Sequence, residues 1–392
     1  MVKLHIYTKR DPRIGLVYHL LEQICKTVYT QLFFCGGRMF HLIVLCFLFL
    51  TGCGSEEKRR VSEDFEELTG KGLSSWEFVE TKEDRAYLSL FKGIYDRLKG
   101  YMRSPGKEER IPRVIHFIWL GPDPFPMKSV QNVRSWRAKH PDWKFCFWTD
   151  RKRPTPLPDM ELRYVQEFPF FKLKECFSQS DNFGEQSDLL RYEVLYREGG
   201  VYVDHDVSCF KPFDVLNCSY DFYCGIDMPY RSALPSSIFT TNNLIGVRPG
   251  HPILLHCMEN LVSHWSELQN LYGGKDRESV LERVLHRTFW HFGLSVKERN
   301  NIEGNRDIVF PAYYFDAPSD ELALFARHQY AGTWHKDATD FEINVKKRLM
   351  TISKKNNLIL LVVGGVGVLN LFGLLALFLY FRSHHANKTA QK

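Results

Sequence analysis

The chain has 392 residues, which is enough for one large domain or two small ones. Hydrophobic residues make up 44% and charged residues 25%, a composition typical of globular proteins. The formal net charge of +6 is modest and no nucleic-acid-binding motif is found, which argues against a nucleic-acid partner. The ten cysteines form no C-x-x-C pair, so a zinc ribbon is not expected.

The N-terminal region, residues 1–54, has two interpretations. The apolar run Leu42–Leu50 has the length of a signal-peptide core, and the Leu-Thr-Gly-Cys sequence ending at Cys53 resembles a bacterial lipoprotein cleavage box. On this interpretation Met39 is the true start and Cys53 carries a lipid. Alternatively, the same run is an uncleaved N-terminal anchor. Residues 55–110 are highly charged and predict a helical linker.

Residues 111–340 alternate between strand and helix patterns. Arg113–Trp119 predicts an apolar strand, Ser129–Lys139 a helix, and Trp143–Trp148 a second strand. Such alternation indicates an α/β domain around a mostly parallel central sheet. In such sheets ligands bind at the carboxyl ends of the strands. We therefore expect Trp119, at the end of the first strand, to lie on the binding edge.

The segment Ser187–Gly200 predicts a helix followed by a glycine turn. Asp188 and Arg191 stand three residues apart, so they are neighbours on the helix surface. An exposed ion pair of this kind usually contributes little to the stability of the fold. This helix, however, leads directly into the next strand, which places its Asp-Arg pair beside the motif that follows.

That motif is Asp-His-Asp, and it follows the short strand pattern Val201–Val203. Because strand side chains alternate between two faces, we expect Asp204 and Asp206 to point the same way and His205 to point the opposite way. Two carboxylates at a strand end suit Mg²⁺ or Mn²⁺ together with phosphate oxygens. Considered alone, a D-x-D sequence is more often a solvated acidic loop.

The C-terminal region carries the clearest compositional signal. Leu358–Phe381 contains no charged residue and would span roughly 36 Å as a helix, enough to cross a bilayer core of about 30 Å. It predicts a transmembrane helix. Residues 341–357 predict a basic amphipathic helix at an anionic membrane surface, and residues 382–392 form a short tail.

Four stretches of the chain carry a resemblance to a known family. They are IPRVIHFIWLG, SDLLRYEVLYREGGVYVDHD, TNNLIGVRPGHP and HQYAGTW. In this order they resemble the family 32 glycosyltransferases, which have a DXD sugar-binding region. The family includes yeast-type Golgi α-mannosyltransferases and inositol phosphorylceramide mannosyltransferases, with the glucosyltransferase domains of bacterial toxins as more distant relatives. The resemblance implies a GT-A fold for residues 111–340.

The resemblance also implies how a nucleotide-sugar donor is held. Trp119 matches the tryptophan that stacks on the donor base. Asp188 and Arg191 match the pair that holds the sugar hydroxyls and helps to place the anomeric carbon. Asn243 matches an asparagine near the sugar, with Asn242 as an alternative.

Near the end of the domain, Thr333 and Trp334 stand where relatives carry a Ser-Trp pair that closes over the diphosphate. Threonine has the same hydroxyl donor as serine, so we expect Thr333 to contact the diphosphate in the same way.

A metal site is implied by the same resemblance. Asp204 matches the first D-x-D carboxylate, near the ribose and the hydrated metal, and Asp206 matches the direct ligand. His328 is the candidate for a third ligand, with His335 as the competing choice. The alternative for His328 is a surface histidine at the end of a helix over residues 321–327.

Two other histidines are given structural interpretations. His116 alternates with apolar neighbours and is expected to be a hydrogen-bonded core residue. His251 lies in a Pro-Gly-His-Pro turn and is also expected to be structural.

The expected function is that of a membrane-anchored, Mn²⁺- or Mg²⁺-dependent retaining glycosyltransferase. GDP-mannose is the favoured donor, followed by UDP-hexoses, and the acceptor is expected to be lipid-linked or a glycan. No strong nucleophile is recognised, and no catalytic base is assigned. The alternatives are a toxin-like effector that glycosylates a protein and a non-catalytic lipoprotein that binds carbohydrate.

Overall fold

The computed structural model describes residues 63–331, except for residues 233, 273–276 and 301. Several predictions lie outside these residues. They concern the N-terminal region 1–54, the amphipathic segment 341–357, the apolar segment 358–381, and the side chains of Thr333, Trp334 and His335. In the part of the chain that the structure describes, no helix combines the length and the apolar character needed to cross a membrane.

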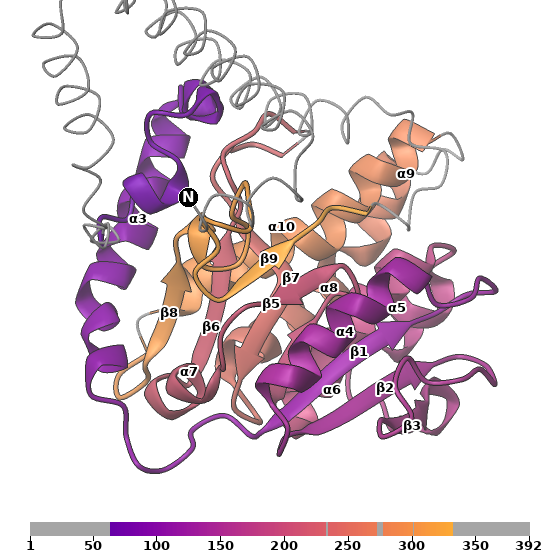
Figure 1. The fold of residues 1–392 in the computed structure, drawn as a ribbon. Helices are drawn as coiled ribbons and strands as arrows, with labels where there is room; N and C mark the ends of the chain where they lie inside the picture. Colours follow the sequence, from indigo (N-terminus) through magenta and orange to yellow (C-terminus); the bar gives the residue numbers. More distant parts are fainter. Residues whose placement is uncertain (1–62, 233, 273–276, 301, 332–392) are drawn as a thin grey trace, which may run out of the picture. The chain divides into compact units, whose positions relative to one another are not determined.

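A seven-stranded sheet forms the centre of the domain (Figure 1). Its spatial order is β3-β2-β1-β4-β7-β6-β8, and all of its strands except β7 run in the same direction. The predicted α/β class with a mostly parallel sheet is therefore confirmed. The strands are β1 (Val114–Trp119), β2 (Lys144–Thr149), β3 (Glu161–Tyr164), β4 (Gly200–Val203), β6 (Phe222–Ile226), β7 (Thr240–Val247) and β8 (Asp307–Phe310).

Two further strands form a separate antiparallel pair, β5 (Val207–Cys209) with β9 (Ala326–His328). The α-helices are α3 (Lys82–Leu98), α4 (Met127–Lys139), α5 (Lys174–Gln179), α6 (Phe183–Glu198), α7 (Asp214–Ser219), α8 (Pro252–Leu271), α9 (Arg277–Val284) and α10 (Trp290–Arg299). A single π-helical turn, η6 (Leu285–Phe289), joins α9 to α10. The remaining short helical turns are η2 (Glu67–Thr69), η3 (Ser74–Phe78), η4 (Lys99–Arg103), η5 (Val165–Glu167) and η7 (Ala312–Tyr314).

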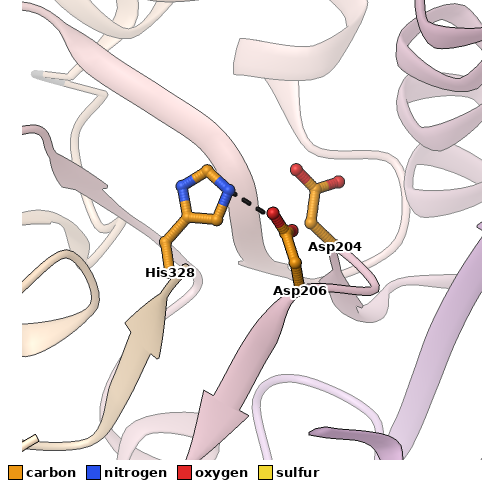
Figure 2. Close-up of side chains that lie close together, drawn as sticks. All are labelled: Asp204, Asp206 and His328. Atoms are coloured by element: carbon orange, nitrogen blue, oxygen red, sulfur yellow. Dashed lines mark ion pairs between the residues drawn. The ribbon is translucent and has the colours of Figure 1, made fainter. Parts of the chain in front are cut away.

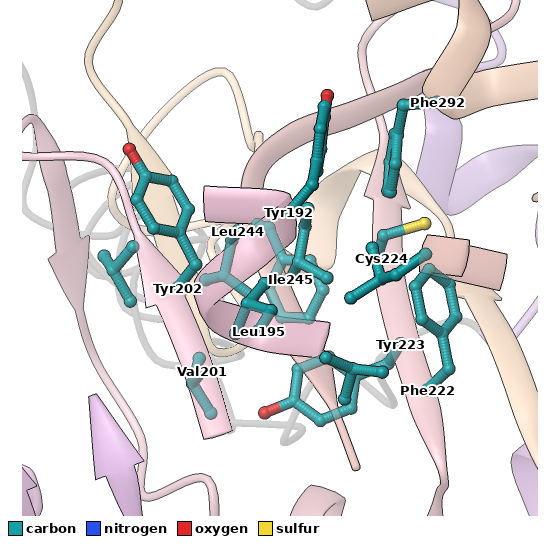
Figure 3. Packing of buried hydrophobic residues seen from close by; sticks show 14 of the residues in the cluster. Tyr192, Leu195, Val201, Tyr202, Phe222, Tyr223, Cys224, Leu244, Ile245 and Phe292 are labelled. Carbon is teal, nitrogen blue, oxygen red and sulfur yellow. The ribbon is translucent and has the colours of Figure 1, made fainter. Parts of the chain in front are cut away.

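The central strands are largely buried because both faces of the sheet are covered. All residues of β4 and β7 are buried, and so are the four middle residues of β1. Helices α6, α8 and α10 pack together on the sheet beside β7. Figure 3 shows part of this core, where Tyr192 of α6 stacks on Phe292 of α10 with ring centroids 5.6 Å apart.

Helix α3 comes from the charged segment for which a helical linker was predicted. Its N-terminus carries a capping box, in which Thr81 and Asp84 each accept from the other's backbone amide. The apolar face of α3 is buried and contacts β8, with Phe91 and Tyr95 almost fully enclosed. Helix α3 is thus packed against the domain, and its charged face points to solvent.

The turn between α6 and β4 requires glycine. Gly199 and Gly200 have φ values of 65° and 98°, in the region that other residues rarely adopt. A Cβ atom on Gly200 would lie 2.6 Å from the carbonyl oxygen of Val114 on β1. The expected turn is confirmed, and the lack of side chains lets β4 pack directly against β1.

The two histidines with structural interpretations behave as expected. His116 on β1 is fully buried, its Nε2 lies 3.0 Å from the carbonyl of Gly199, and its Nδ1 accepts from Trp148 Nε1 at 3.2 Å. These contacts assign the neutral form with the proton on Nε2. His251 caps α8 and lies 3.0 Å from Asp307 Oδ1.

The burial of His116 predicts a pH-dependent stability. Burial lowers the pKa of His116 from 6.5 to about 4, so between these pH values the unfolded chain binds the proton more tightly. Stability should be complete above pH 6.5 and should fall as the pH approaches 4, by at most about 3 kcal/mol from this residue.

The test compares urea unfolding of the wild type and of His116→Gln at several pH values. The variant should lose less stability between pH 6.5 and 4 than the wild type does. Equal losses in the two proteins would contradict this role of His116.

Candidate functional site

The candidate site lies at the carboxyl edge of the sheet. Strands β1 and β4 are parallel neighbours, and both end at this edge, with Trp119 closing β1 and Asp204 following β4. Trp119 therefore lies on the edge where it was expected, and Asp204 lies on the same edge. The parallel direction of the strands therefore gathers residues that are far apart in the sequence.

The D-x-D segment is a turn, whereas the sequence predicted the alternation of a strand. Strand β4 ends at Val203, and the amide of Val207 donates to the carbonyl of Asp204 at 3.1 Å, which closes the turn. The two aspartates nevertheless converge on one site, and His205 turns away from them toward Trp119. The predicted directions of the three side chains are confirmed, but they follow from the geometry of a turn and not from the alternation of a strand.

Pairing of β5 with β9 brings His328 to the D-x-D segment. Val207 lies opposite His328 in the register, and the amide of Gln329 donates to the carbonyl of Asp206 at 3.0 Å. The predicted alternative of a surface histidine at the end of a helix over residues 321–327 is wrong, because His328 ends strand β9 and its side chain is only 15% exposed.

Asp204, Asp206 and His328 form a possible metal site (Figure 2). One ligand atom from each lies within 4.8 Å of the others, and His328 Nε2 is 3.3 Å from Asp206 Oδ1. Tyr202 donates its hydroxyl to Asp204 at 2.5 Å, and the amide of Ala331 donates to Asp206 at 2.6 Å. Two oriented carboxylates and one imidazole are a donor set that fits Mn²⁺.

In this cluster each charged group favours the charged form of its neighbour. Burial opposes ionisation of Asp206, but the nearby His328 outweighs it and holds the pKa of Asp206 below its ordinary value. Burial likewise opposes protonation of His328, yet Asp206 and Asp316 raise its pKa well above the ordinary value. Without a cation, the carboxylates therefore draw a proton onto the ring, and a bound divalent ion would replace that positive charge.

Asp188 and Arg191 lie beside the metal cluster. The guanidinium Nη2 of Arg191 is 2.7 Å from Asp188 and 3.3 Å from Asp204, while Nη1 donates to the carbonyl of Asn242 at 2.6 Å. The guanidinium also covers the ring of Tyr202. Asp188 and Arg191 are thus neighbours, as expected. Their ion pair is buried, whereas their spacing in the sequence was equally compatible with an exposed pair.

A residue that sequence reasoning missed holds Asp188. Thr288, in the π-helical turn η6, lies with its Oγ1 2.5 Å from Asp188 Oδ2, and its carbonyl accepts from Tyr192 at 3.1 Å. Burial raises the pKa of Asp188 to about 6, although Arg191 opposes the shift. Nothing in the sequence near Thr288 indicates this contact, because π-turns have no recognised sequence signal.

Asn243 contacts the metal cluster from β7. Its Nδ2 lies 2.7 Å from Asp316 Oδ1 and 2.9 Å from His328 Nδ1. Asp316 is fully buried and was not recognised in the sequence, where no motif surrounds it. Tyr202 was also missed, although strand alternation could have placed it on the face of Asp204.

Trp119 is partly exposed at the end of β1. Its indole Nε1 donates to the carbonyl of Asp123 at 2.8 Å, and its ring contacts Phe125 and His205 edge to face. The side chain is therefore held in one orientation, with apolar surface at the same edge as the aspartates.

Comparisons with known proteins agree with this geometry. Residues 126–223 match the family described as "Glycosyltransferase sugar-binding region containing DXD motif". This part of the chain is thus similar to the sugar-binding region of DXD glycosyltransferases. The resemblance drawn from the sequence is confirmed, and the D-x-D of Asp204 and Asp206 falls inside the matched region.

Proteins of known name are also similar to this chain. Inositol phosphoceramide mannosyltransferase 1 of Schizosaccharomyces pombe is 35% identical over 163 residues, which cover 40% of this chain and 45% of that protein. Subversion of eukaryotic traffic protein A of Legionella pneumophila is 32% identical over 123 residues, 28% of this chain and 19% of that protein. The chain thus spans less than half the length of these relatives.

Among solved structures, a PaToxG glycosyltransferase matches with a TM-score of 0.38 and 21% sequence identity. The match covers 54% of this chain and 78% of that chain.

The metal cluster predicts a stability effect of Mn²⁺. An ion that binds only the folded state should raise the melting temperature, with about 2.7 kcal/mol of stabilisation at 100 times the dissociation constant. Asp206→Asn should lose this Mn²⁺-dependent rise, whereas Asp214→Asn, at an exposed carboxylate away from the cluster, should retain it. An equal Mn²⁺-dependent rise in Asp206→Asn and wild type would contradict the site.

Burial of Arg191 predicts a large loss on its removal. Arg191→Met leaves Asp188 and Asp204 without their shared cation, and breaking a buried pair costs about 3 to 5 kcal/mol. The control is Arg110→Met, because Arg110 also pairs with a buried aspartate, Asp221, but is 32% exposed. Urea unfolding should show the larger loss for Arg191→Met. A loss no greater than that of the control would refute the role of burial.

Proposed function

We propose that the chain is a membrane-anchored, metal-dependent retaining glycosyltransferase with a GT-A-like domain. It transfers a hexose, with mannose favoured, from a nucleotide sugar to a lipid-linked or glycan acceptor. The observation that carries this proposal is the meeting of Asp188, Arg191, Asp204, Asp206 and His328 at the carboxyl edge of the sheet. A non-catalytic carbohydrate-binding protein would have little reason to bring these charged groups together.

The donor sugar is assigned to the Asp188–Arg191 pair. Thr288 occupies one oxygen of Asp188 and Arg191 faces the other, so the carboxylate has a single orientation. A sugar hydroxyl would donate to this carboxylate, and Arg191 would orient the group beside Asp204. Asn243, whose backbone carbonyl accepts from the amide of Asp204 and whose side chain contacts His328, would contact the same sugar.

The donor base is assigned to Trp119. Its indole N–H is already committed to the Asp123 carbonyl, so the ring contributes apolar surface and not a hydrogen bond. A flat aromatic surface suits stacking against a nucleotide base. By resemblance, Thr333 and Trp334 would close over the diphosphate.

The diphosphate is assigned to the Asp204, Asp206 and His328 cluster with Mn²⁺ or Mg²⁺. When bound, such an ion would neutralise the negative charge that develops on the departing nucleotide diphosphate. Tyr202 and the amide of Ala331 hold the two carboxylates in place before any donor binds. Such preorganisation is what allows a site to stabilise charge without rearranging.

Mannose and a lipid-linked acceptor are supported by the relatives and by the C-terminal sequence. Two relatives of 35% and 34% identity are named inositol phosphoceramide mannosyltransferases. The basic segment 341–357 and the apolar segment 358–381 would hold the domain at a bilayer, near lipid headgroups. GDP-mannose is therefore the first donor to test, with UDP-hexoses next.

A protein acceptor is the second candidate. It rests on the resemblance to the glucosyltransferase domains of bacterial toxins. One relative is a Legionella pneumophila protein whose name describes subversion of eukaryotic traffic. Both candidates share the donor chemistry, so they differ only in the acceptor that receives the sugar.

The donor assignment predicts a separation of binding from turnover. With Mn²⁺ and the full-length chain, GDP-mannose should be hydrolysed faster than UDP-hexoses. Asp188→Ala should lower this turnover at least about 100-fold, a loss typical of removing one preorganised polar contact, while GDP binding remains. The control Asp221→Asn, at the opposite edge of the sheet, should keep its turnover per folded molecule.

Hydrolysis is followed by release of labelled mannose, and GDP binding by calorimetry. Loss of GDP binding in Asp188→Ala would overturn the assignment of this residue to the sugar. Absence of turnover with every nucleotide sugar, despite donor binding, would favour the non-catalytic carbohydrate-binding protein.

A further inference from the structure

The imidazole ring of His328 lies between two carboxylates. Its Nε2 is 3.3 Å from Asp206 Oδ1, and its Nδ1 is 3.4 Å from Asp316 Oδ1. Asp206 belongs to the metal cluster, whereas Asp316 does not. Asp316 follows η7 and is fully buried, and it faces the ring nitrogen opposite to the one that faces the cluster.

Backbone contacts hold Asp316 and His328 together. Asp316 forms a β-bridge with Arg327, and the amide of His328 donates to the carbonyl of Phe315 at 2.9 Å. The carboxylate of Asp316 is fixed further by Asn243 at 2.7 Å and by Tyr330 at 3.2 Å. It is therefore held beside Nδ1.

A metal ion can bind only a ring nitrogen that carries no proton. If Nε2 faces the metal cluster as a ligand, the proton of the neutral ring must be on Nδ1. Two groups face Nδ1, the carboxylate of Asp316 and the amide nitrogen of Asn243. Only the carboxylate can accept a hydrogen bond, because an amide nitrogen is a donor.

The orientation of the Asn243 amide follows from its own contacts. Thr241 donates its hydroxyl to Asn243 Oδ1 at 3.0 Å, and Asn243 Nδ2 donates to Asp316. The amide can therefore donate to Nδ1 only when the ring proton is on Nε2. In that tautomer Nε2 donates to Asp206 and has no lone pair for a metal ion.

We propose that Asp316 is a positioning residue for the metal site, which accepts the Nδ1 proton of His328 and leaves the Nε2 lone pair directed at Asp204 and Asp206. The proposal rests on the proposed function, because the metal site is part of it. A carboxylate in this position fixes the tautomer and the ring orientation of a histidine ligand and makes it a better ligand. Asp316 contributes no ligand atom of its own.

The experiment titrates Mn²⁺ into the full-length chain and measures free Mn²⁺ by electron paramagnetic resonance. Asp316→Asn should weaken Mn²⁺ binding by roughly 10- to 100-fold, the effect typical of losing such a supporting contact. The matched control is Asp307→Asn. Asp307 is also a buried aspartate paired with a buried histidine, His251, but at the opposite edge of the sheet. Its Mn²⁺ affinity should be unchanged.

A double-mutant cycle separates positioning from a general effect on charge or folding. If Asp316 acts through His328, Asp316→Asn should cause no further loss of Mn²⁺ affinity in a His328→Ala background. Equal losses in both backgrounds would overturn the proposal, and so would an unchanged affinity of Asp316→Asn with His328 intact.

A measurement on the wild type covers the case in which Asp316→Asn fails to fold. With ¹⁵N-labelled histidine and Cd²⁺ as a diamagnetic probe, the His328 signals should show a metal-bound Nε2 and a protonated Nδ1. A metal-bound Nδ1 would overturn the proposal. Failure of the wild type to bind either ion would overturn the metal site itself, and with it the proposed metal dependence.

Discussion

The buried positive charge of Arg191 is the constraint around which the site is built. A buried guanidinium is tolerated only beside carboxylates and hydrogen-bond acceptors. It meets Asp188 on its own helix, Asp204 after β4, and the carbonyl of Asn242 on β7. One side chain thus joins α6 to two strands of the sheet. Any shift of α6 along β4 would separate these charges, so the helix and both strands keep one relative position.

The second constraint is the pairing of β5 with β9. The hydrogen bonds of this short ladder place His328 opposite Val207, one residue after the D-x-D segment. The chain between them is about 120 residues long, so no local preference could bring them together. The backbone thus positions the imidazole, and the carboxylates of Asp206 and Asp316 then determine how its two nitrogens are used.

Several parts of the site could be predicted because their signals are local. The spacing of Asp188 and Arg191 on one helical turn indicated a pair, and the glycines before β4 indicated a turn with positive φ. The convergence of Asp204 and Asp206 was also expected, although a strand was assumed where the chain forms a turn. Short apolar runs predicted the strands because burial on both faces of a parallel sheet selects such residues.

The amino-acid sequence by itself determined the α/β class, the mostly parallel sheet, the glycine turn and the residues of the D-x-D segment. All of these depend on neighbours in the chain. Only the tertiary structure decided that Thr288 holds Asp188, that Asp316 faces His328, and that the Asp188–Arg191 pair is buried. Thr288 lies 100 residues from Asp188 in the chain, so no local pattern could indicate that contact. The energies of all three arrangements arise from burial of charge, which the pattern of residues along the chain does not express.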